Sequence, residues 1–368
     1  MDIEKNRVTL LISSLAGGGA EGVCVNVANG LVNQGWVVDL VVLHLDDQVY
    51  LNRLDNRVNL VDLDTKNARN SFLPLSLYIL KEKPDKFLVF NYELSIILVF
   101  IRCFLMREFK IAARNINTLS EIFQKESGFW LRFIVNPLIK SFYFNVDYII
   151  NQCEAMKDDL VNNFPCVSSK TGVIYNPVSQ DIEEFSNGSE FKKIKKQSYL
   201  LCVGRLEKQK AFHYSIEAFS RLANDFPELR LKIVGKGSLE QDLRQYAMKL
   251  GVSDKVDFEG FKVDMIPYYT NAKATLLTSI YEGFPNVLVE SIALGTPVVS
   301  FNCPSGPSEI IQEGINGFLC NYKDIEDFRL KLTKLLSCDF NVDTVRETVQ
   351  RNQSSVVAER FADIIRAL

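Results

Sequence analysis

The chain lacks most of the residue patterns that hydrolytic, metal-dependent and redox enzymes use. It holds only two histidines, His44 and His213, and contains no HExxH or GxSxG motif. Its eight cysteines form no CxxC pair, and no group of Asp, Glu, His and Cys has the spacing of a metal site. Hydrolytic and metal chemistry are therefore poorly supported, and scattered buried thiols in a reducing compartment are expected.

Long apolar runs and an excess of one charge are also absent. The most apolar segment, residues 94–101, is too short to span a bilayer and ends at Arg102. Residues 7–14 run into a glycine loop without a site that resembles signal-peptide cleavage. The formal net charge of −3 gives no signature of nucleic-acid binding. We therefore expect a cytoplasmic protein without a nucleic-acid partner.

Two domains are expected, because 368 residues are too many for a typical single core. Short apolar strands alternate with helices in two successive series, which is typical of parallel, doubly wound sheets. The expected fold class is α/β, with two Rossmann-like domains that face a central cleft. The expected domains span residues 1–178 and 179–350, and a C-terminal helix at 351–368 is expected to pack back toward the first domain.

A polar stretch, residues 179–196, joins the two series. It contains Asn187-Gly188-Ser189 and a basic run at 192–196. We interpret it as a linker with a solvated surface, and a functional basic patch is the alternative.

Glu282 and Glu290 flank the start of an expected helix in the second domain, with seven residues between them. Gly283 permits a tight backbone approach, and Pro285 suits the first turn of a helix. The amides of a helix start can hold an anion, and Gly295 can cap the helix end. One carboxylate before the helix and one on its second turn suit a ligand that carries both phosphate and hydroxyl groups.

Other loops of the second domain also follow expected strands. Arg205 and Lys210 are five residues apart and can converge on a diphosphate, although an ordinary exposed loop is the alternative. Gly235 and Gly237 form a weak candidate for a phosphate or nucleotide loop. Backbone groups of residues 259–261 could meet the edge of a base.

Two strand ends of the first domain carry further candidates. Gly17, Gly18 and Gly19 follow the first strand but depart from the G-x-G-x-x-G pattern. Either a simple turn or a loop that needs bare backbone near a ligand explains them. Arg114 and Asn115 directly follow another strand, at the edge where open α/β sheets place their ligand sites.

Three motifs together resemble a known family. The segments GRLEKQK at 204–210, IVGKG at 233–237 and EGFPNVLVESIALGTPVV at 282–299 are similar to the GT-B glycosyltransferases of family 4. These are retaining enzymes that use a nucleotide-sugar donor. The resemblance covers both domains, and the element with two glutamates is its most specific part.

The resemblance implies a role for each candidate. Arg205 and Lys210 would neutralise the donor diphosphate and Glu282 would contact the transferred sugar, so these three are the predicted catalytic residues. Glu290 would bind the ribose hydroxyls, and the Gly17–Gly19 loop resembles a loop of the family near the acceptor. The predicted donor-binding residues are Gly17, Gly18, Gly19, Gly204, Gly235, Gly237, Phe261, Gly283, Phe284, Pro285, Asn286, Val287, Leu288 and Glu290.

The resemblance also implies that no metal or other cofactor is required, because cationic side chains and the helix end would stabilise the leaving group. Many relatives carry a histidine near the reacting centre, where this chain has Arg114 and Asn115. We name these two as acceptor-cleft residues rather than as a general base.

Arg-Asn at that position, together with residues 303–311, resembles a bacterial branch that builds surface polysaccharides and lipid-linked oligosaccharides. The expected donor is a UDP-linked hexose or N-acetylhexosamine. The expected acceptor is a polyprenyl-diphosphate-linked glycan in capsule, lipopolysaccharide O-antigen or glycoprotein glycan assembly.

A membrane surface is a further expected partner. Residues 96–110 and 129–144 mix apolar and basic side chains and could rest on anionic headgroups at the cytoplasmic face of the inner membrane. Both segments could equally be core helices. Two other functions stay open: a nucleotide-sugar-binding module without turnover, and a GT-B-like UDP-sugar epimerase or phosphorylase.

Overall fold

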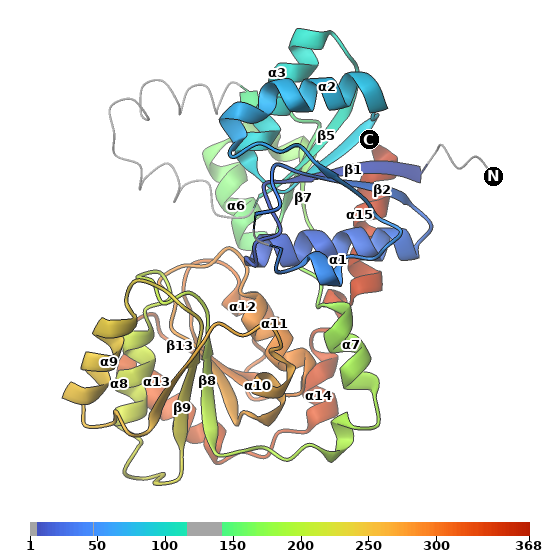
Figure 1. Ribbon diagram of the computed structural model, residues 1–368. Helices are drawn as coiled ribbons and strands as arrows, with labels where there is room; N and C mark the ends of the chain where they lie inside the picture. Colours follow the sequence, from blue (N-terminus) through green and yellow to red (C-terminus); the bar gives the residue numbers. More distant parts are fainter. Residues whose placement is uncertain (1–5, 47, 116–141) are drawn as a thin grey trace. The chain divides into compact units, whose positions relative to one another are not determined.

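The computed structural model describes residues 6–46, 48–115 and 142–368. The chain divides into two compact units (Figure 1). The first unit is Met1–Ser179 together with Gln353–Leu368, and the second is Gln180–Asn352. Each unit holds one parallel sheet between layers of helices, so the predicted doubly wound α/β fold is confirmed. The central cleft stays a prediction.

The sheet of the first unit has the strand order β3-β2-β1-β4-β5-β6-β7, and its pairs are parallel. Its elements are β1 (Arg7–Ile12), α1 (Gly19–Asn33), β2 (Val37–Val42), β3 (Asn59–Asp62), α2 (Phe72–Glu82), β4 (Lys86–Val89), α3 (Tyr92–Leu105), β5 (Lys110–Arg114), β6 (Tyr148–Asn151), α6 (Glu154–Asn163), β7 (Thr171–Val173) and α15 (Ser354–Ala367).

Helices cover both faces of this sheet because its strands are apolar on both sides. Alternate residues of a strand point to opposite faces. Leu10 and Ile12 of β1 pack in the cluster that contains the buried residues of α1 and α15. Leu11, between them, packs in the other cluster, with buried residues of α2 and α3. The first unit therefore has one core on each side of its sheet.

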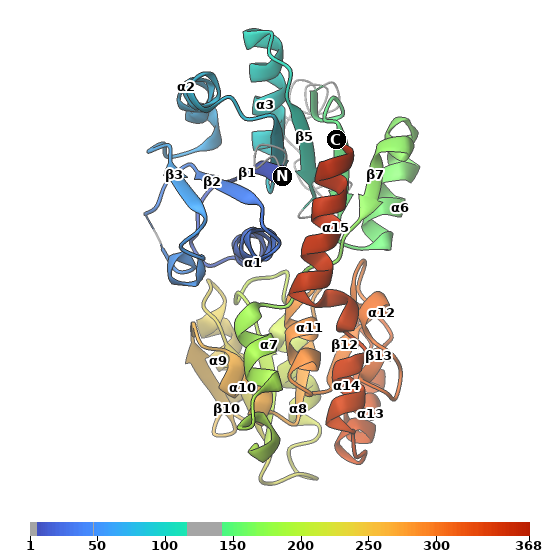
Figure 2. The ribbon, with the colours of Figure 1, turned by 90° about the vertical axis from the view of Figure 1, so that its right-hand side faces the viewer.

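The C-terminal helix α15 packs against α1 in the first unit (Figure 2). A Cβ atom added to Gly30 of α1 would lie 2.7 Å from the Cβ of Ala358, so the glycine permits the close approach of the two helices. The Lys86 ammonium donates a hydrogen bond to the Ile365 carbonyl at 2.6 Å. The last segment of the chain therefore belongs to the first unit.

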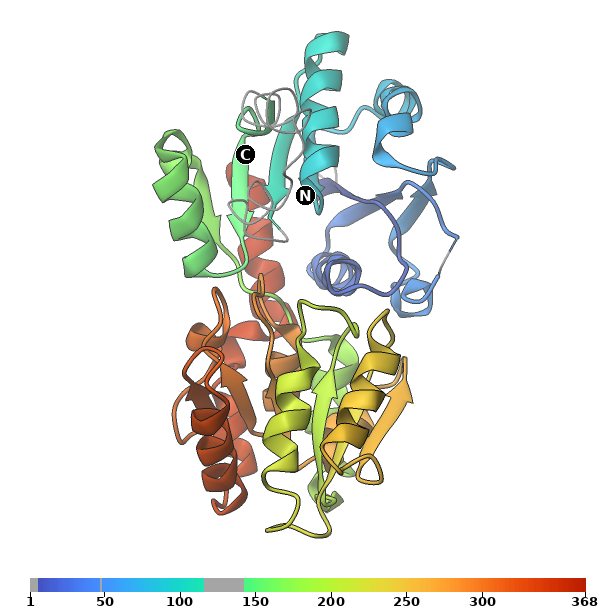
Figure 3. The same cartoon turned by 90° about the vertical axis from the view of Figure 1, so that its left-hand side faces the viewer.

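The sheet of the second unit has the order β10-β9-β8-β11-β12-β13, again with parallel pairs. Helices α8, α9 and α13 lie on one face, and α7, α10, α11 and α14 lie on the other (Figures 1 and 3). Its elements are α7 (Gln180–Asn187), β8 (Tyr199–Val203), α8 (Phe212–Ser220), β9 (Arg230–Val234), α9 (Glu240–Lys249), β10 (Val256–Gly260), α10 (Ile266–Asn271), β11 (Ala274–Leu277), α11 (Asn286–Ala293), β12 (Val298–Phe301), α12 (Pro307–Ile310), β13 (Gly317–Cys320), α13 (Ile325–Leu336) and α14 (Val342–Glu347).

The structure corrects three sequence-based expectations. Residues 179–196 are not a plain linker, because α7 forms there with Ile182 buried, and it packs on α11. Only two apolar side chains in its eight residues gave too sparse a pattern. The tail also contains α14, which comes before the expected C-terminal helix and was not predicted. Of the eight cysteines, all reduced, Cys103, Cys166 and Cys338 are exposed rather than buried. Most of the predicted helix at 129–144 lies outside the described residues.

Candidate functional site

The predicted catalytic residues lie at the point where the strand order of the second sheet reverses. Strands β8 and β11 are neighbours, while β9 continues the sheet on one side and β12 on the other. Loops that leave the carboxyl ends of two such strands diverge and form the crevice in which open α/β sheets bind ligands. Arg205 and Lys210 lie on the loop after β8, and Glu282 lies on the loop after β11.

Lys210 and Glu282 form an ion pair inside this site. The Lys210 Nζ lies 2.7 Å from Glu282 Oε1, and the Ser279 hydroxyl donates a second hydrogen bond to the same oxygen. The side chain of Lys210 is 15% exposed and that of Glu282 is 7% exposed. Two predicted catalytic residues are therefore held together by a charge pair that is largely withdrawn from water.

Gln209 joins the two loops, and the sequence interpretation missed it. Its side-chain amide donates to the Tyr281 carbonyl at 3.1 Å, and its backbone carbonyl accepts from the Ile280 amide at 2.8 Å. The Arg205 guanidinium is exposed and only touches the Gln209 side chain, at 3.5 Å. The guanidinium is therefore accessible to an anionic ligand at the edge of the site.

The glycines of the second unit allow neighbouring loops to pack backbone against backbone. A Cβ at Gly235 would lie 1.9 Å from the Gly204 carbonyl oxygen, and a Cβ at Gly237 would lie 2.4 Å from that of Leu206. The Leu206 amide donates to the Lys236 carbonyl at 2.9 Å. Close packing of the loops by itself explains why these positions need glycine. Their role in donor binding stays a prediction.

The loop that precedes α11 is hydrogen-bonded to the loop after β12. The Ser305 hydroxyl donates to the Glu282 carbonyl, and the Glu282 amide donates to the Pro304 carbonyl at 3.3 Å. Gly306, also in the loop after β12, has φ +96°. It approaches Pro285 so closely that a Cβ atom added to Gly306 would lie 2.4 Å from Pro285 Cδ. Burial raises the pKa of the nearby Cys303 thiol to about 12, so that thiol is not a nucleophile at neutral pH.

Helix α11 begins at Asn286, with Pro285 as its N-cap, so the proline precedes the first turn in which it was predicted. The Pro285 side chain, which carries no polar atom, does not cap the helix. The side chains of Phe284 and Leu288 are buried. Any contact that these two make with a donor would therefore use their backbone groups.

Glu290 lies on the second turn of α11, as predicted, and is partly exposed. The hydroxyl of Tyr269, on α10, donates a hydrogen bond to Glu290 Oε2 at 2.8 Å. Phe261 follows β10 and is about half exposed, at 47%. An exposed aromatic ring at a strand end can stack on a base.

The three N-terminal glycines lie in the first unit, whereas the other predicted donor-binding residues lie in the second. Gly17 has φ +101°, Gly18 is the N-cap of α1, and Gly19 is its first residue. A Cβ at Gly18 would lie 2.3 Å from a carboxylate oxygen of Glu21. The backbone therefore turns tightly into α1 at these glycines, and the Glu21 side chain packs against it.

Arg114 and Asn115 lie at the end of β5, as expected, but both are buried, with exposures of 1% and 3%. Arg114 donates to Asn176 Oδ1 and lies over the Phe90 ring, while its Nε and Nη1 have no hydrogen-bond partner among the residues that the structure describes. Burial lowers the pKa of Arg114 to about 10, so the guanidinium remains charged at neutral pH.

Amide side chains form a buried network around this arginine. The Asn115 amide donates to Asn151 at 2.8 Å, and the Tyr143 hydroxyl donates to Asn115. The Gln152 side chain donates to the Asn115 carbonyl at 2.8 Å and accepts from Asn176 at 3.0 Å. The sequence interpretation missed all four partners, because they come from distant elements.

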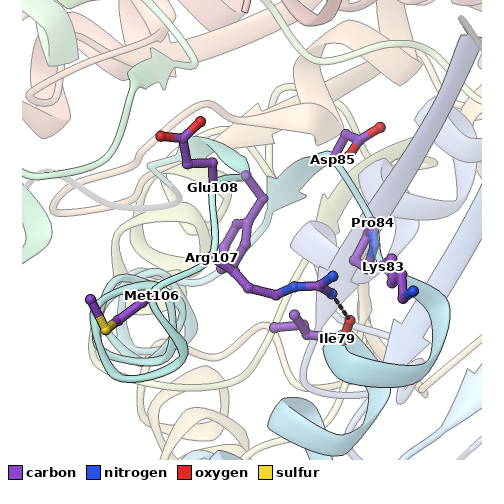
Figure 4. A pocket seen from close by; sticks show the side chains of 8 residues that line it. Ile79, Lys83, Pro84, Asp85, Met106, Arg107 and Glu108 are labelled. Atoms are coloured by element: carbon purple, nitrogen blue, oxygen red, sulfur yellow. Dashed lines mark hydrogen bonds between the residues drawn. The ribbon is translucent and has the colours of Figure 1, made fainter.

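A hollow of about 290 Å³ lies elsewhere, between the C-terminal ends of α2 and α3 (Figure 4). Lys83, Asp85, Arg107 and Glu108 are among the residues that line it. Arg107 donates to the Ile79 carbonyl at 3.1 Å and thus caps α2. None of the predicted site residues lines this hollow. Within residues 6–46, 48–115 and 142–368, no three His, Cys, Asp or Glu side chains group as a metal site would require.

Comparison with known proteins gives the family. Residues 17–181 match the family model described as Glycosyltransferase Family 4, and residues 184–354 match that described as Glycosyl transferases group 1. An uncharacterized glycosyltransferase of Haemophilus influenzae is 29% identical over 328 residues, which are 87% of both chains. The N-acetylgalactosamine-N,N'-diacetylbacillosaminyl-diphospho-undecaprenol 4-alpha-N-acetylgalactosaminyltransferase of Campylobacter jejuni is 27% identical over 323 residues, 85% of both chains.

Solved structures share the fold of the whole chain. The lipopolysaccharide outer core galactosyltransferase WaaB matches with a TM-score of 0.72 and 22% identity over 98% of this chain and 99% of its own. Anabaena HepE in complex with UDP and glucose matches with a TM-score of 0.74 and 20% identity over 98% of this chain and all of its own. The two family models together cover almost the whole chain, and the fold is that of GT-B enzymes. The chain therefore belongs to family 4 of the glycosyltransferases.

Proposed function

We propose that this glycosyltransferase moves a hexose or N-acetylhexosamine from a UDP-sugar to a growing glycan, with retention of the anomeric configuration. The observation that carries the proposal is the convergence of Arg205, Lys210 and Glu282 at the switch point of the second sheet, with Glu290 on the adjoining helix. This arrangement offers two cations for a diphosphate and two carboxylates for hydroxyl groups. HepE, which shares the fold, was solved with UDP and glucose.

In the proposed reaction, Arg205 and Lys210 hold the diphosphate. The bond between the anomeric carbon and the diphosphate oxygen breaks, and the acceptor oxygen bonds to that carbon on the same face. The departing phosphate takes the acceptor proton. Positive charge near the leaving group stabilises it as negative charge develops there. Lys210 already contacts Glu282, so the donor would have to share its ammonium with that carboxylate.

The other groups serve recognition in this proposal. Glu290 accepts hydrogen bonds from the ribose hydroxyls, and Phe261 lies at the base. Backbone groups of residues 284–287, at the start of α11, face the sugar and the phosphate. Gly17, Gly18 and Gly19, at the start of α1, contact the donor, whereas Arg114 and Asn115 lie on the acceptor side. No step in this scheme requires a metal ion, and that remains part of the proposal.

The proposed acceptor is a polyprenyl-diphosphate-linked oligosaccharide of a bacterial surface or protein-linked glycan. The Campylobacter relative, named for transfer to a diphospho-undecaprenol-linked glycan, supports this class. The lipopolysaccharide 1,6-galactosyltransferase of Salmonella typhimurium, which is 32% identical over 203 residues, 52% of this chain and 54% of its own, supports a surface glycan as the product but not the polyprenyl carrier.

A lipid-linked acceptor requires access to a membrane surface, and we propose peripheral binding through the first unit. Leu73, Leu77 and Leu80 form an exposed stripe along α2, and Phe104 and Met106 are exposed at the end of α3. Exposed apolar groups of this extent mark interaction surfaces. None of the described helices combines the length and the apolar character that spanning a membrane requires.

Most cations of residues 96–110 already have partners, so apolar insertion rather than charge would dominate this contact. Arg102 and Lys110 pair with Asp147, and Arg107 caps α2. In a flotation assay, we expect the chain to rise with vesicles of anionic lipid and Leu77→Asp to remain in the dense fraction. Failure of the unmodified chain to float would contradict peripheral binding.

A donor screen tests the reaction itself. UDP and UDP-sugars should raise the melting temperature of the protein, because a ligand that binds only the folded state stabilises it. The stabilising UDP-sugar should then release UDP only when a lipid-linked glycan acceptor is present. Stabilisation without release with any acceptor would favour a binding module. Exchange of sugar epimers without an acceptor would favour an epimerase.

A further inference from the structure

We propose that Tyr269 is a positioning residue that fixes the Glu290 carboxylate for recognition of the donor ribose. The inference rests on the proposed function, since it takes Glu290 as the ribose acceptor. It adds a residue from a different helix, whose side chain would not touch the donor.

Tyr269 contacts Glu290 directly. The Tyr269 hydroxyl donates to Glu290 Oε2 at 2.8 Å, and α10 and α11 lie side by side in the second unit (Figure 1). Tyr269 has no measurable exposure, whereas Glu290 is partly exposed. The bond therefore reaches the carboxylate from the core. A carboxylate accepts several hydrogen bonds, so this one is compatible with ribose hydroxyls as further donors.

Tyr269 is itself held in place by hydrogen bonds to its backbone. The Thr296 hydroxyl donates to the Tyr269 carbonyl at 2.7 Å, and the Tyr269 amide donates to the Met265 carbonyl at 3.1 Å. Thr296 in turn accepts a hydrogen bond from Lys196. A donor on a fixed, buried ring restricts the rotation of the glutamate side chain, which has three rotatable bonds. Such preorganisation lowers the entropic cost of binding.

A substitution by phenylalanine removes only the Tyr269 hydroxyl. Tyr269→Phe preserves the ring in its packed position and leaves Glu290 charged and in place. Tyr199→Phe is a matched control in the same unit. Tyr199 is also buried, and its hydroxyl donates to the Tyr268 carbonyl at 2.7 Å, without a bond to Glu290.

The experiment measures the affinity of the full chain for UDP and for 2′,3′-dideoxy-UDP by calorimetry. A site that hydrogen-bonds hydroxyl groups rejects an analogue that lacks them. We expect a large ratio of the two dissociation constants for the unmodified chain and for Tyr199→Phe. Glu290→Gln should lose most of this discrimination. Tyr269→Phe should lower it about five- to tenfold, mainly through weaker UDP binding.

Each outcome supports or overturns a defined statement. Tyr269→Phe with an unchanged ratio, alongside a reduced ratio in Glu290→Gln, would overturn the positioning role and leave the proposed function intact. An unchanged ratio in Glu290→Gln would overturn the ribose contact and the inference with it. No UDP binding by the unmodified chain would contradict the proposed donor. An equal reduction of the ratio in Tyr199→Phe would mean that the effect is a general loss of packing, and it would overturn the positioning role.

Discussion

Truncation of Lys210 should reduce stability as well as activity, because it leaves the Glu282 carboxylate without its charged partner. The pair is 2.7 Å apart, and its side chains are 15% and 7% exposed. Removing one partner of a fully buried pair costs about 3–5 kcal/mol, whereas fully exposed pairs contribute about 0–1 kcal/mol. The small exposure and the remaining hydrogen bond from Ser279 place the expected cost of Lys210→Ala at about 2–3 kcal/mol.

For a unit of this size, that cost corresponds to a fall in melting temperature of roughly 4–12 °C. Calorimetry of Lys210→Ala, Lys210→Ala/Glu282→Gln and Lys193→Ala tests the reasoning. The double variant should recover about half of the loss, because an amide carries no charge, and should still transfer no sugar. Lys193 pairs with Glu190 at the exposed surface, so Lys193→Ala should melt within 2 °C of the unmodified chain. A Lys210→Ala protein that melts at the unmodified temperature would refute the argument.

Three further predictions follow from buried groups and close contacts. Burial lowers the pKa of Lys196 to about 7 in the folded state, from 10.5. The unfolded chain therefore binds more protons between these two pH values, and stability rises with pH from about 7 to 10.5. In denaturant titrations, Lys196→Met should stabilise the protein by about 1–2 kcal/mol at pH 6 and by less at pH 9. Gly235→Ala should cost at least about 3 kcal/mol and abolish UDP binding, because the added Cβ would lie 1.9 Å from the Gly204 carbonyl oxygen. Gly251→Ala is the control: nothing lies within 4 Å of its added Cβ, so it should cost only about 1 kcal/mol for its positive φ. Thermal melting measures both. Arg114→Met should be as stable as the unmodified chain within about 1 kcal/mol, since it removes two buried nitrogens that have no hydrogen-bond partner among the described residues. This variant should bind UDP normally in calorimetry but transfer sugar slowly, and weakened UDP binding would contradict the place of Arg114 on the acceptor side.

Sequence reasoning was sufficient for the fold because the strands are short, apolar and regularly spaced. Leu10, Leu11 and Ile12 read as a buried run, and that run is what a strand covered by helices on both faces requires. The loops after β8 and β11 could be located for the same reason, since each follows such a run. Helix α7 escaped because only Ile182 and Phe185 are apolar in it.

The partners of the site residues could not be predicted, because they depend on tertiary packing. Tyr269 precedes Glu290 by 21 residues on another helix, and no local pattern marks the pair. Gly235 could be recognised as special, but the sequence could not distinguish approach to a ligand from approach to the Gly204 backbone. Arg114 was located at a strand end, while its burial depends on amide side chains from several elements.

Hydrogen exchange of the full chain with and without UDP tests most directly whether the donor site lies at the switch point of the second sheet. We expect UDP to slow exchange of backbone amides in residues 203–210, 259–263 and 280–290. Glu290→Gln should weaken this protection at equal UDP concentration. Protection confined to the first unit, or none in these segments at a UDP concentration that stabilises the protein, would contradict the account.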